Sequence, residues 1–305
     1  MHSRAQRWRR HWERDKYLYL LLVPVVLYFI IFKYLPMLGE VMAFKNYRLS
    51  EGIWGSPWVG LDQFRKLFTS RDFVQILRNT LLLNVYSLVF AFPVPILLAL
   101  MLNEVRSELY KRVLQNFLYI PHFMSWIVLG GIVIALLSPS TGVINSILKA
   151  FGLEPVYFMA STFWWPITFV GSSIWREAGF GTILFLAAMA AINPQLYEAA
   201  AIDGAGKLRQ VWHVTLPGIR STIAILLVLQ VGRMMDVGFE QVYSLQNSTV
   251  ASVAEVISTY VYKRGIVGLQ YSYTTALGLF QSVVSLLLVI SVNRLIRAMG
   301  ERGLW

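Results

Sequence analysis

Six long apolar stretches follow one another along the chain, with short polar segments between them. The first covers residues 17–32 and resumes past Lys33, whose amine can reach the membrane surface, over residues 35–44. The other five run over residues 76–102, 117–137, 163–192, 222–245 and 273–292. A bilayer core of roughly 30 Å needs about 20 helical residues at about 1.5 Å each. The pattern therefore predicts an all-α, polytopic membrane protein with six transmembrane helices.

Positive charge along the chain predicts the orientation of these helices. An even number of spans places both ends of the chain on one side, and 15 of the 27 Lys and Arg residues fall in the segments on that side. Because cytoplasmic loops are enriched in Lys and Arg, both termini are expected to be cytoplasmic. The chain then divides into a basic tail at 1–16, a transmembrane domain at 17–297 and a short tail at 298–305.

The N-terminal segment admits a second interpretation. A basic stretch followed by an apolar one is also typical of a cleaved signal peptide. No A-x-A-like cleavage site follows the apolar stretch, which continues to Phe44. We therefore expect a retained first transmembrane helix.

Composition narrows the class of protein. With 56% hydrophobic residues, 14% charged residues and a mean hydropathy of +0.56, the chain is too apolar for one soluble core. The formal charge of +11 fits membrane orientation signals, and no binding to nucleic acid is expected. There is no Cys, and the four His residues, at 2, 11, 122 and 213, cannot supply an H-E-x-x-H pattern. We expect no catalytic residues and no metal site.

Three prolines fall inside the predicted spans. Pro93 and Pro95 lie in the second span and Pro121 near the start of the third, and each removes a backbone hydrogen-bond donor. The kinks they predict are either tolerated bends in packed helices or broken helices that line a translocation path. Gly130 and Gly131 are expected to be helix packing contacts.

The segment between the fourth and fifth spans, residues 193–217, has the features of a short helix. Asn193 is a suitable N-cap, Pro194 a suitable first helical residue, and Glu198 lies in the early turns, where the helix dipole favours an acid. The small residues of D-G-A-G at 203–206 then allow a turn or the close approach of another backbone. This helix suits docking in a groove on a partner; the alternative is an ordinary surface helix between two spans.

The same segment carries a motif with fixed spacing. Glu198-Ala199-Ala200, three residues, Gly204, nine residues and Val214-Thr215-Leu216-Pro217 resemble the EAA loop of permease subunits in ATP-binding-cassette (ABC) importers, with Val214 where Ile is usual. The longer string EAAAIDGAGKLRQVWHVTLP is similar to the version in carbohydrate-uptake, maltose permease-like proteins. Further similarity at residues 119–121, 175, 259–262 and 278–282 indicates the oligosaccharide and polysaccharide branch that includes alginate-type permeases. The large extracytoplasmic insertion of the maltose permease is missing.

This resemblance implies the type I importer permease fold and its mechanism. Such a permease pairs with a homologous second permease, and their coupling helices sit in clefts of two cytoplasmic ATPase subunits. An extracytoplasmic binding protein delivers the substrate, here an oligosaccharide, and the ATPases drive alternating access across the bacterial inner membrane. The coupling residues implied here are Glu198, Ala199, Ala200, Asp203, Gly204, Ala205, Leu216 and Pro217.

The ATPase activity is expected in another chain. No G-x-x-x-x-G-K-[ST] loop occurs in this sequence, so ATP and Mg²⁺ are expected to be used by the partner ATPase, with no cofactor bound here. The alternatives are a permease of the same class for another solute, and a secondary transporter, which needs inverted repeats and an internal coupling site.

Polar residues at membrane depth are candidates for substrate contact, because ionisable groups there are costly and usually face a cavity or a partner. Residue-by-residue resemblance to the sugar contacts of the maltose permease suggests Ser173, Arg176, Glu177 and Phe180, together with His122, Trp126, Met234 and Gly238. Arg233 and Asp236 join them by depth in the predicted fifth span. The alternative is that Arg176 with Glu177, and Arg233 with Asp236, are neutralising pairs.

The charge of the sugar stays open at this stage. An Arg side chain that is partly free can bind a carboxylate bidentately, which suits a uronate oligosaccharide. If both Arg residues are fully paired with acids, a neutral sugar is expected.

Overall fold

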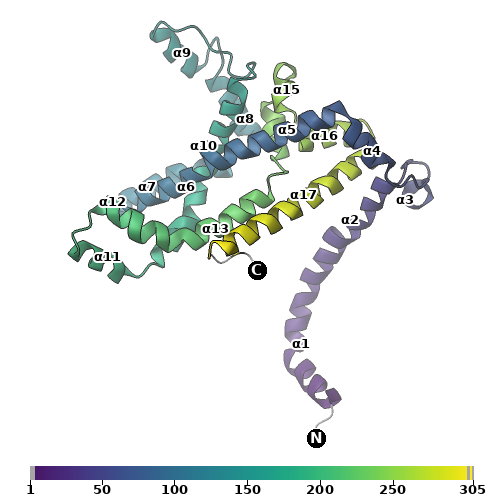
Figure 1. Ribbon diagram of the computed structural model, residues 1–305, viewed down its shortest axis with the longest axis horizontal. Helices are drawn as coiled ribbons and strands as arrows, with labels where there is room; N and C mark the ends of the chain where they lie inside the picture. Colours follow the sequence, from purple (N-terminus) through teal and green to yellow (C-terminus); the bar gives the residue numbers. More distant parts are fainter. Residues whose placement is uncertain (1–3, 301–302, 304–305) are drawn as a thin grey trace.

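The apolar stretches form helices in the computed structural model, which describes residues 4–300 and 303 (Figure 1). Four helical segments are long and apolar enough to cross a membrane: Asp15–Phe44, Arg71–Asn103, Lys207–Gly232 and Tyr271–Ala298. Two bent pairs pass the same test together: Glu108–Phe123 with Trp126–Leu136, and Trp164–Ala190 with Pro194–Ile202. The structure thus has up to six candidate spans, as predicted; in the second pair Trp164–Ala190 occupies the predicted span at 163–192, and Pro194–Ile202 follows the bend. No strand occurs in the described part of the chain.

The described part of the chain consists of helices joined by helical turns and short loops. The α-helices are α1 (Arg4–Phe29), α2 (Leu35–Met37), α3 (Gly52–Gly55), α4 (Asp62–Thr69), α5 (Arg71–Tyr86), α6 (Pro93–Asn103), α7 (Glu108–Tyr119), α8 (Trp126–Leu136), α9 (Val143–Ala150), α10 (Trp164–Ala190), α11 (Pro194–Ile202), α12 (Lys207–Gln210), α13 (Leu216–Gly232), α14 (Phe239–Leu245), α15 (Ala251–Ala254), α16 (Ile257–Val261) and α17 (Tyr271–Ala298). Four π-helical turns, η1 (Ile30–Tyr34), η3 (Ser87–Ala91), η5 (Val211–Thr215) and η7 (Tyr262–Val267), and three 3₁₀ turns, η2 (Leu38–Phe44), η4 (Ile120–Phe123) and η6 (Ser248–Val250), connect them.

The predicted tails fall partly outside the described residues. Of the basic tail at 1–16, residues 4–16 begin α1 and residues 1–3 lie outside. Of the tail at 298–305, residues 301, 302, 304 and 305 lie outside. The three-part division of the chain and the cytoplasmic placement of its ends stay predictions.

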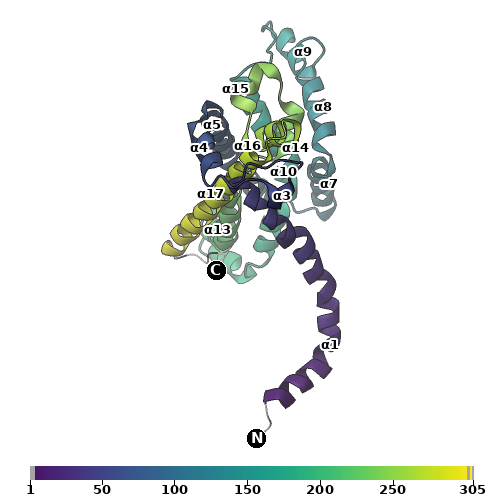
Figure 2. The same ribbon diagram turned by 90° about the vertical axis from the view of Figure 1, so that its right-hand side faces the viewer.

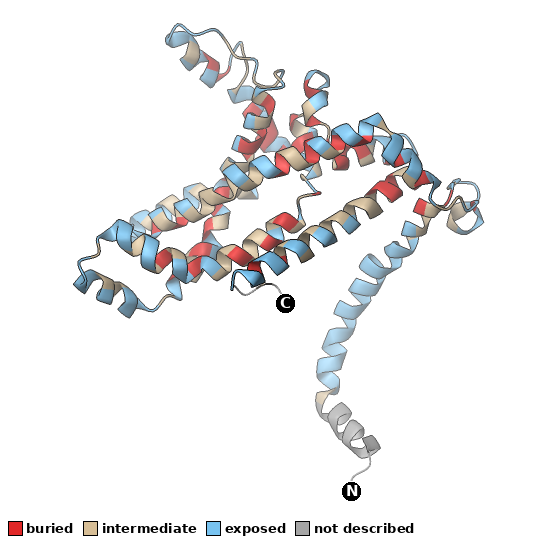
Figure 3. Ribbon diagram, in the orientation of Figure 1, coloured by how far each residue is buried: buried red, intermediate tan, exposed pale blue. Residues whose placement is uncertain are grey.

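The first span stands apart from the rest of the bundle (Figures 1 and 2). None of the most apolar 18-residue window of Asp15–Phe44 is buried, and Figure 3 shows the described part of α1 exposed along almost its whole length. A helix that is apolar all round must be covered by lipid or by another protein. The cover of this apolar window therefore lies outside its own chain, whereas the end of the span at η2 packs against α17.

Three of the π-turns share a position relative to proline. They end two residues before Pro36, Pro93 and Pro217, and the residue just before each proline donates its N–H five residues back. A proline ring clashes with the carbonyl four residues earlier in a regular helix, and the wider turn relieves this clash. The predicted kink at Pro93 thus takes the form of a π-turn inside a continuous span, Arg71–Asn103.

At Pro121 the chain bends far more strongly. The helix ends in η4, and α8 leaves at 104° to the axis of the preceding segment. Ser125 caps α8 by accepting a hydrogen bond from Val128 N at 3.3 Å. The third predicted span is therefore a broken helix, as the second interpretation of its proline required.

The fifth predicted span, residues 222–245, was wrong at both ends. The helix that crosses begins before residue 222, with α13 starting at Leu216, and it ends at Gly232. The chain then turns, and α14 begins only after Gly238, which has φ +76°. Because a left-handed conformation interrupts a helix and favours glycine, the apolar run cannot be one helix. Arg233 and Asp236 therefore lie beyond the helix and not inside it.

Close packing of α7 against α10 depends on Gly179. A Cβ atom added there would lie 2.0 Å from the carbonyl oxygen of Leu118, whereas Gly171, on the same helix, has no atom within 4 Å of such a position. Of the two glycines predicted to pack, Gly130 has Ser244 Cβ at 3.0 Å and Gly131 has no neighbour within 4 Å. The prediction is confirmed for Gly130, and Gly131 has no such contact within this chain.

A stability prediction follows from this crossing. Gly179→Ala is expected to lower the stability of the protein by about 1–3 kcal/mol, because overpacking forces two backbones apart. The measurement is thermal unfolding of the purified protein in detergent. Gly171→Ala is the matched control and is expected to unfold at or slightly above the wild-type temperature, since alanine favours helix. Equal unfolding temperatures for the two variants would contradict the prediction.

Candidate functional site

One face of α10 carries three of the predicted substrate-pathway residues. Ser173, Glu177 and Phe180 are spaced i, i+4 and i+7, which places them on one side of a helix. Because α10 is a single helix of 27 residues, it holds these side chains in a fixed order along its axis. The broken third span brings His122 and Trp126 to the same region.

Glu177 joins two basic side chains from different elements. Its Oε1 accepts a hydrogen bond from Arg176 Nη1, and its Oε2 lies 2.8 Å from Nδ1 of His122 on η4. Because a carboxylate oxygen accepts hydrogen bonds, this bond forms in the tautomer that carries a proton on Nδ1. The predicted pairing of Arg176 with Glu177 is thus present, and His122 is part of the same cluster.

Arg176 has further contacts that use most of its guanidinium. Its Nε donates to the carbonyl oxygen of Met124 at 3.2 Å, and its Cζ lies 4.8 Å from the ring centroid of Trp126. The side chain is 19% exposed, compared with 43% for Glu177. An ion pair, a backbone acceptor and a cation–π contact fix this arginine between α10 and α8. Its geometry is that of a structural anchor.

His122 also presents a flat surface with Phe180. The two rings are stacked with centroids 4.0 Å apart and planes 3° from parallel. Phe180 is exposed over 41% of its surface. Exposed aromatic faces of this kind suit the C–H faces of sugar rings, while carboxylates and amides nearby can bind hydroxyl groups.

A cleft of about 660 Å³ borders this cluster. It is lined by residues from the second, third, fourth and fifth spans: Ser87, Ala91, Phe92, Pro95, His122, Ser173, Glu177, Phe180, Gly181, Leu184, Phe185, Leu226, Leu229, Gln230 and Arg233. Five of these are predicted substrate-pathway residues. The other five, Trp126, Arg176, Met234, Asp236 and Gly238, do not line the cleft, although Arg176 is bonded to Glu177 and lies over Trp126.

Arg233 differs from Arg176 in its surroundings. It caps the end of α13, is exposed, and within the described residues forms no ion pair with Asp236. Asp236 Oδ1 instead accepts a hydrogen bond from the Gly238 N–H at 3.0 Å, which shapes the turn. The neutralising pair between Arg233 and Asp236 is therefore absent from the structure.

Two buried or half-buried amides hold the break after α13, and the sequence reasoning missed both. Asn84 Nδ2 donates to the Met234 carbonyl at 2.9 Å, and Gln281 Nε2 donates to the Met235 carbonyl at 2.7 Å. These carbonyls lie outside a helix and need such donors. Polar amides inside the apolar second and sixth spans were the available signal, because such groups are costly in a membrane unless they are bonded.

A second large cleft has a different character. It measures about 510 Å³ and is lined mainly by apolar side chains from α5, η3 and the start of α10, among them Tyr86, Phe90 and Phe163. With few polar groups to bind hydroxyls, it suits lipid or an apolar helix better than a sugar.

The segment predicted to be a docking helix forms α11 as expected. Asn193 Oδ1 accepts a hydrogen bond from Gln195 N at 3.0 Å, and Pro194 is the first helical residue. At the other end, Gly204 N donates to the Ala201 carbonyl at 3.0 Å and Ala205 N to the Ala200 carbonyl at 2.8 Å. This pattern is a Schellman motif, which requires the φ of +76° at Gly204.

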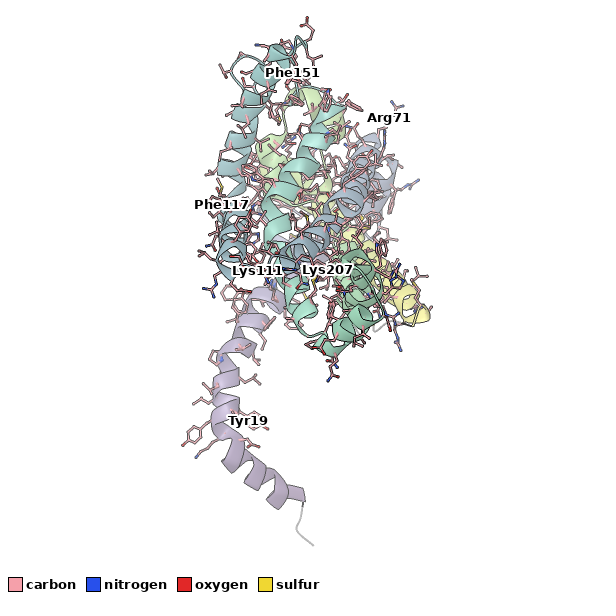
Figure 4. All side chains as sticks on the ribbon, turned by 90° about the vertical axis from the view of Figure 1, so that its left-hand side faces the viewer. Tyr19, Arg71, Lys111, Phe117, Phe151 and Lys207 are labelled. Carbon is pink, nitrogen blue, oxygen red and sulfur yellow. The ribbon has the colours of Figure 1, made fainter. Side chains whose placement is uncertain are left out.

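The coupling segment exposes apolar side chains. Leu196, Ile202, Leu208 and Trp212 are 53–87% exposed, and no residue of α11 or α12 is buried. Glu198, Ala199 and Asp203 are exposed, whereas Leu216 and Pro217 begin α13. Figure 4 shows Lys207 and Lys111 near the same end of the bundle, away from Arg71 and Phe151. Several exposed apolar side chains in one short segment are typical of a protein interaction site.

The motif, the span pattern and this geometry agree with a known family. The family described as "Binding-protein-dependent transport system inner membrane component" matches residues 91–302. The chain belongs to this family. It is accordingly a multi-pass permease component of an ABC importer in the cytoplasmic membrane.

Relatives of this permease include proteins named as parts of transport systems. The chain is 49% identical, over 96% of its length and 91% of the relative, to the polygalacturonan/rhamnogalacturonan transport system permease protein YteP of Bacillus subtilis (strain 168). It resembles a chain in the crystal structure of a bacterial alginate ABC transporter in complex with an alginate pentasaccharide-bound periplasmic protein, with a TM-score of 0.89 and 43% identity over 97% of this permease and 99% of that chain.

A further structure of a bacterial ABC transporter, involved in the import of the acidic polysaccharide alginate, gives a TM-score of 0.89 at 44% identity, covering 96% of this permease and 99% of that chain. These similarities extend from α1 to α17 and confirm the permease fold expected from the EAA motif.

Proposed function

We propose that this chain forms half of the translocation pathway in an ATP-driven oligosaccharide importer. The observation that carries the proposal is the cleft where Glu177, the His122–Phe180 ring pair and Arg233 meet. It combines aromatic faces with charged hydrogen-bonding groups, as recognition of a sugar requires. The names of the relatives, which transport polygalacturonan, rhamnogalacturonan and alginate, support this substrate class.

The proposed partners supply the functions that this permease does not provide by itself, namely ATP hydrolysis, substrate delivery and the other half of the pathway. A second, homologous permease would cover the exposed span Asp15–Phe44 and supply the other half of the pathway. One of two ATPase subunits would dock on α11 through Glu198, Ala199, Ala200, Asp203, Gly204 and Ala205, with Leu216 and Pro217 leading into α13, and the other would dock on the second permease. An extracytoplasmic binding protein would deliver the sugar. ATP and Mg²⁺ act in the ATPases, and this subunit is not itself catalytic.

We further propose that the sugar is acidic. Arg233 lines the cleft and is exposed there, whereas Arg176 is engaged on three sides. A guanidinium in a cleft with low-dielectric walls binds a carboxylate bidentately. The alginate transporter, which imports an acidic polysaccharide, is similar to this chain over nearly its whole length.

The subunit alone is expected neither to hydrolyse ATP nor to transport sugar. The sequence has no phosphate-binding loop, and one permease provides only half of the pathway. The test compares proteoliposomes that contain this chain alone with proteoliposomes that contain both permeases, the ATPases and the sugar-loaded binding protein. Uptake by the chain alone would contradict the proposal, and ATP-dependent uptake only by the complete set would support it.

A further inference from the structure

The coupling helix α11 has few contacts with the bundle that it must move. All its residues are exposed or half-buried, and it leaves the line of α10 at 73°. Its C-terminal end is a Schellman turn whose backbone N–H groups bond back to α11, and whose Ala205 carbonyl accepts a hydrogen bond from Gln210 of α12 at 3.0 Å. Apart from the backbone on either side of it, α11 is joined to the transmembrane helices by a small number of side chains.

One hydrogen bond joins α11 to the start of the fifth span. The hydroxyl of Tyr197, on the half-buried side of α11, lies 3.0 Å from Oγ1 of Thr215. Thr215 is 2% exposed and is the last residue of the π-turn η5. Because Thr215 is buried, water does not compete strongly for this bond.

The second contact between the coupling segment and the bundle is weaker. Lys207 Nζ lies 3.1 Å from Glu104 Oε2, at the end of α6, but the two side chains are 67% and 42% exposed. Exposed ion pairs contribute little, because water and salt screen them. The hydrogen bond to Thr215 is the better candidate for transmitting a movement.

The position of Thr215 links this bond to the cleft. It directly precedes Leu216-Pro217, and α13 then runs for 17 residues, about 25 Å, to Arg233. The π-turn η5 separates this helix from α12, and π-turns are helix segments that often occur at functional sites. A pull on Thr215 therefore acts on the base of a helix whose other end lines the cleft.

We propose that Tyr197 is a positioning residue that transmits the movement of α11 to α13 through Thr215. This inference rests on the proposed function, because it assigns a role within ATP-driven transport. This role differs from ATPase docking, because the Tyr197 hydroxyl bonds to Thr215 of its own chain. Loss of the hydroxyl leaves α11 available to the ATPase but allows it to move without α13.

The test measures ATP hydrolysed per sugar imported by the complete complex in proteoliposomes. Tyr197→Phe removes the hydroxyl and keeps the ring, and Thr215→Val removes the other partner at similar volume. Each is expected to raise the ratio about fivefold, the effect of one lost hydrogen bond. The double variant is expected to match the single variants, because both changes remove the same interaction. The control is Tyr110→Phe on α7, whose hydroxyl forms no hydrogen bond among the described residues.

The outcomes separate this inference from the proposed function. Complexes purified with Tyr197→Phe are expected to retain the ATPase; loss of the ATPase would make Tyr197 a docking contact and overturn the inference. An unchanged ratio in both single variants, or additive effects in the double variant, would also overturn it. If the wild-type complex hydrolyses ATP without importing sugar, the proposed function itself fails.

Discussion

Replacing Arg233 with glutamine is expected to lower the uptake of acidic oligosaccharides by about tenfold to a hundredfold and to change the uptake of neutral ones little. The reason is that Arg233 lines the cleft and has no acidic partner among the described residues, so its guanidinium is available to a substrate carboxylate. A hydrogen bond to a charged group contributes about 1.5–3 kcal/mol. The measurement is uptake into vesicles by the complete transporter, with sugars that its binding protein already accepts.

The matched control is Arg176→Gln. Arg176 is bonded to Glu177 and the Met124 carbonyl and lies over Trp126, so its loss disturbs the cluster whatever the charge of the sugar. Acidic and neutral sugars should therefore lose uptake to the same extent in this variant. If Arg233→Gln also lowers both classes equally, the carboxylate contact is wrong and the acidic-sugar proposal should be dropped.

Gly204→Trp is expected to uncouple ATP hydrolysis from transport almost completely. Gly204 has φ +76°, where a residue with a side chain costs about 1–2 kcal/mol, and no atom of this chain lies within 4 Å of a Cβ there. The new side chain would distort the end of α11 and project into space that a docked ATPase would occupy. The measurement is ATPase activity of the complete complex with and without sugar-loaded binding protein.

Gly206 provides the control in the same turn. It also has open space around a Cβ position, but its φ is −65°, which any residue adopts. Gly206→Ala should therefore keep coupling close to wild type. Normal stimulation of ATPase activity by substrate in Gly204→Trp would count decisively against α11 as the docking helix.

The sequence predicted the helices and motifs that depend on local pattern. The cap at Asn193 and the turn at Gly204 both follow from short-range spacing. Local hydrogen bonds and helical periodicity specify such features, so one segment of sequence contains the information.

The features that the sequence did not predict correctly depend on contacts between distant segments of the chain. The predicted fifth span included residues 234–245, where apolar residues alternate with polar ones. Hydropathy reports solubility in lipid and not continuity of a helix, so it did not place the break. The break there is held by Asn84 and Gln281, which are 150 and 46 residues away from the carbonyls they bind. The state of Arg176 was likewise undetermined, since its partners at Met124 and Trp126 reach it only because the chain bends at Pro121.

The isolation of the first span has a consequence for biosynthesis. α1 precedes every other helix along the chain, and so it is made first, yet the apolar window of its span has no buried residue within its own subunit. If a second permease covers it, the order of synthesis and the order of packing are opposite: the earliest helix completes its contacts last. The number of subunits that finish folding would then be set by the supply of the other permease, and a surplus of this chain would remain with its first span in lipid.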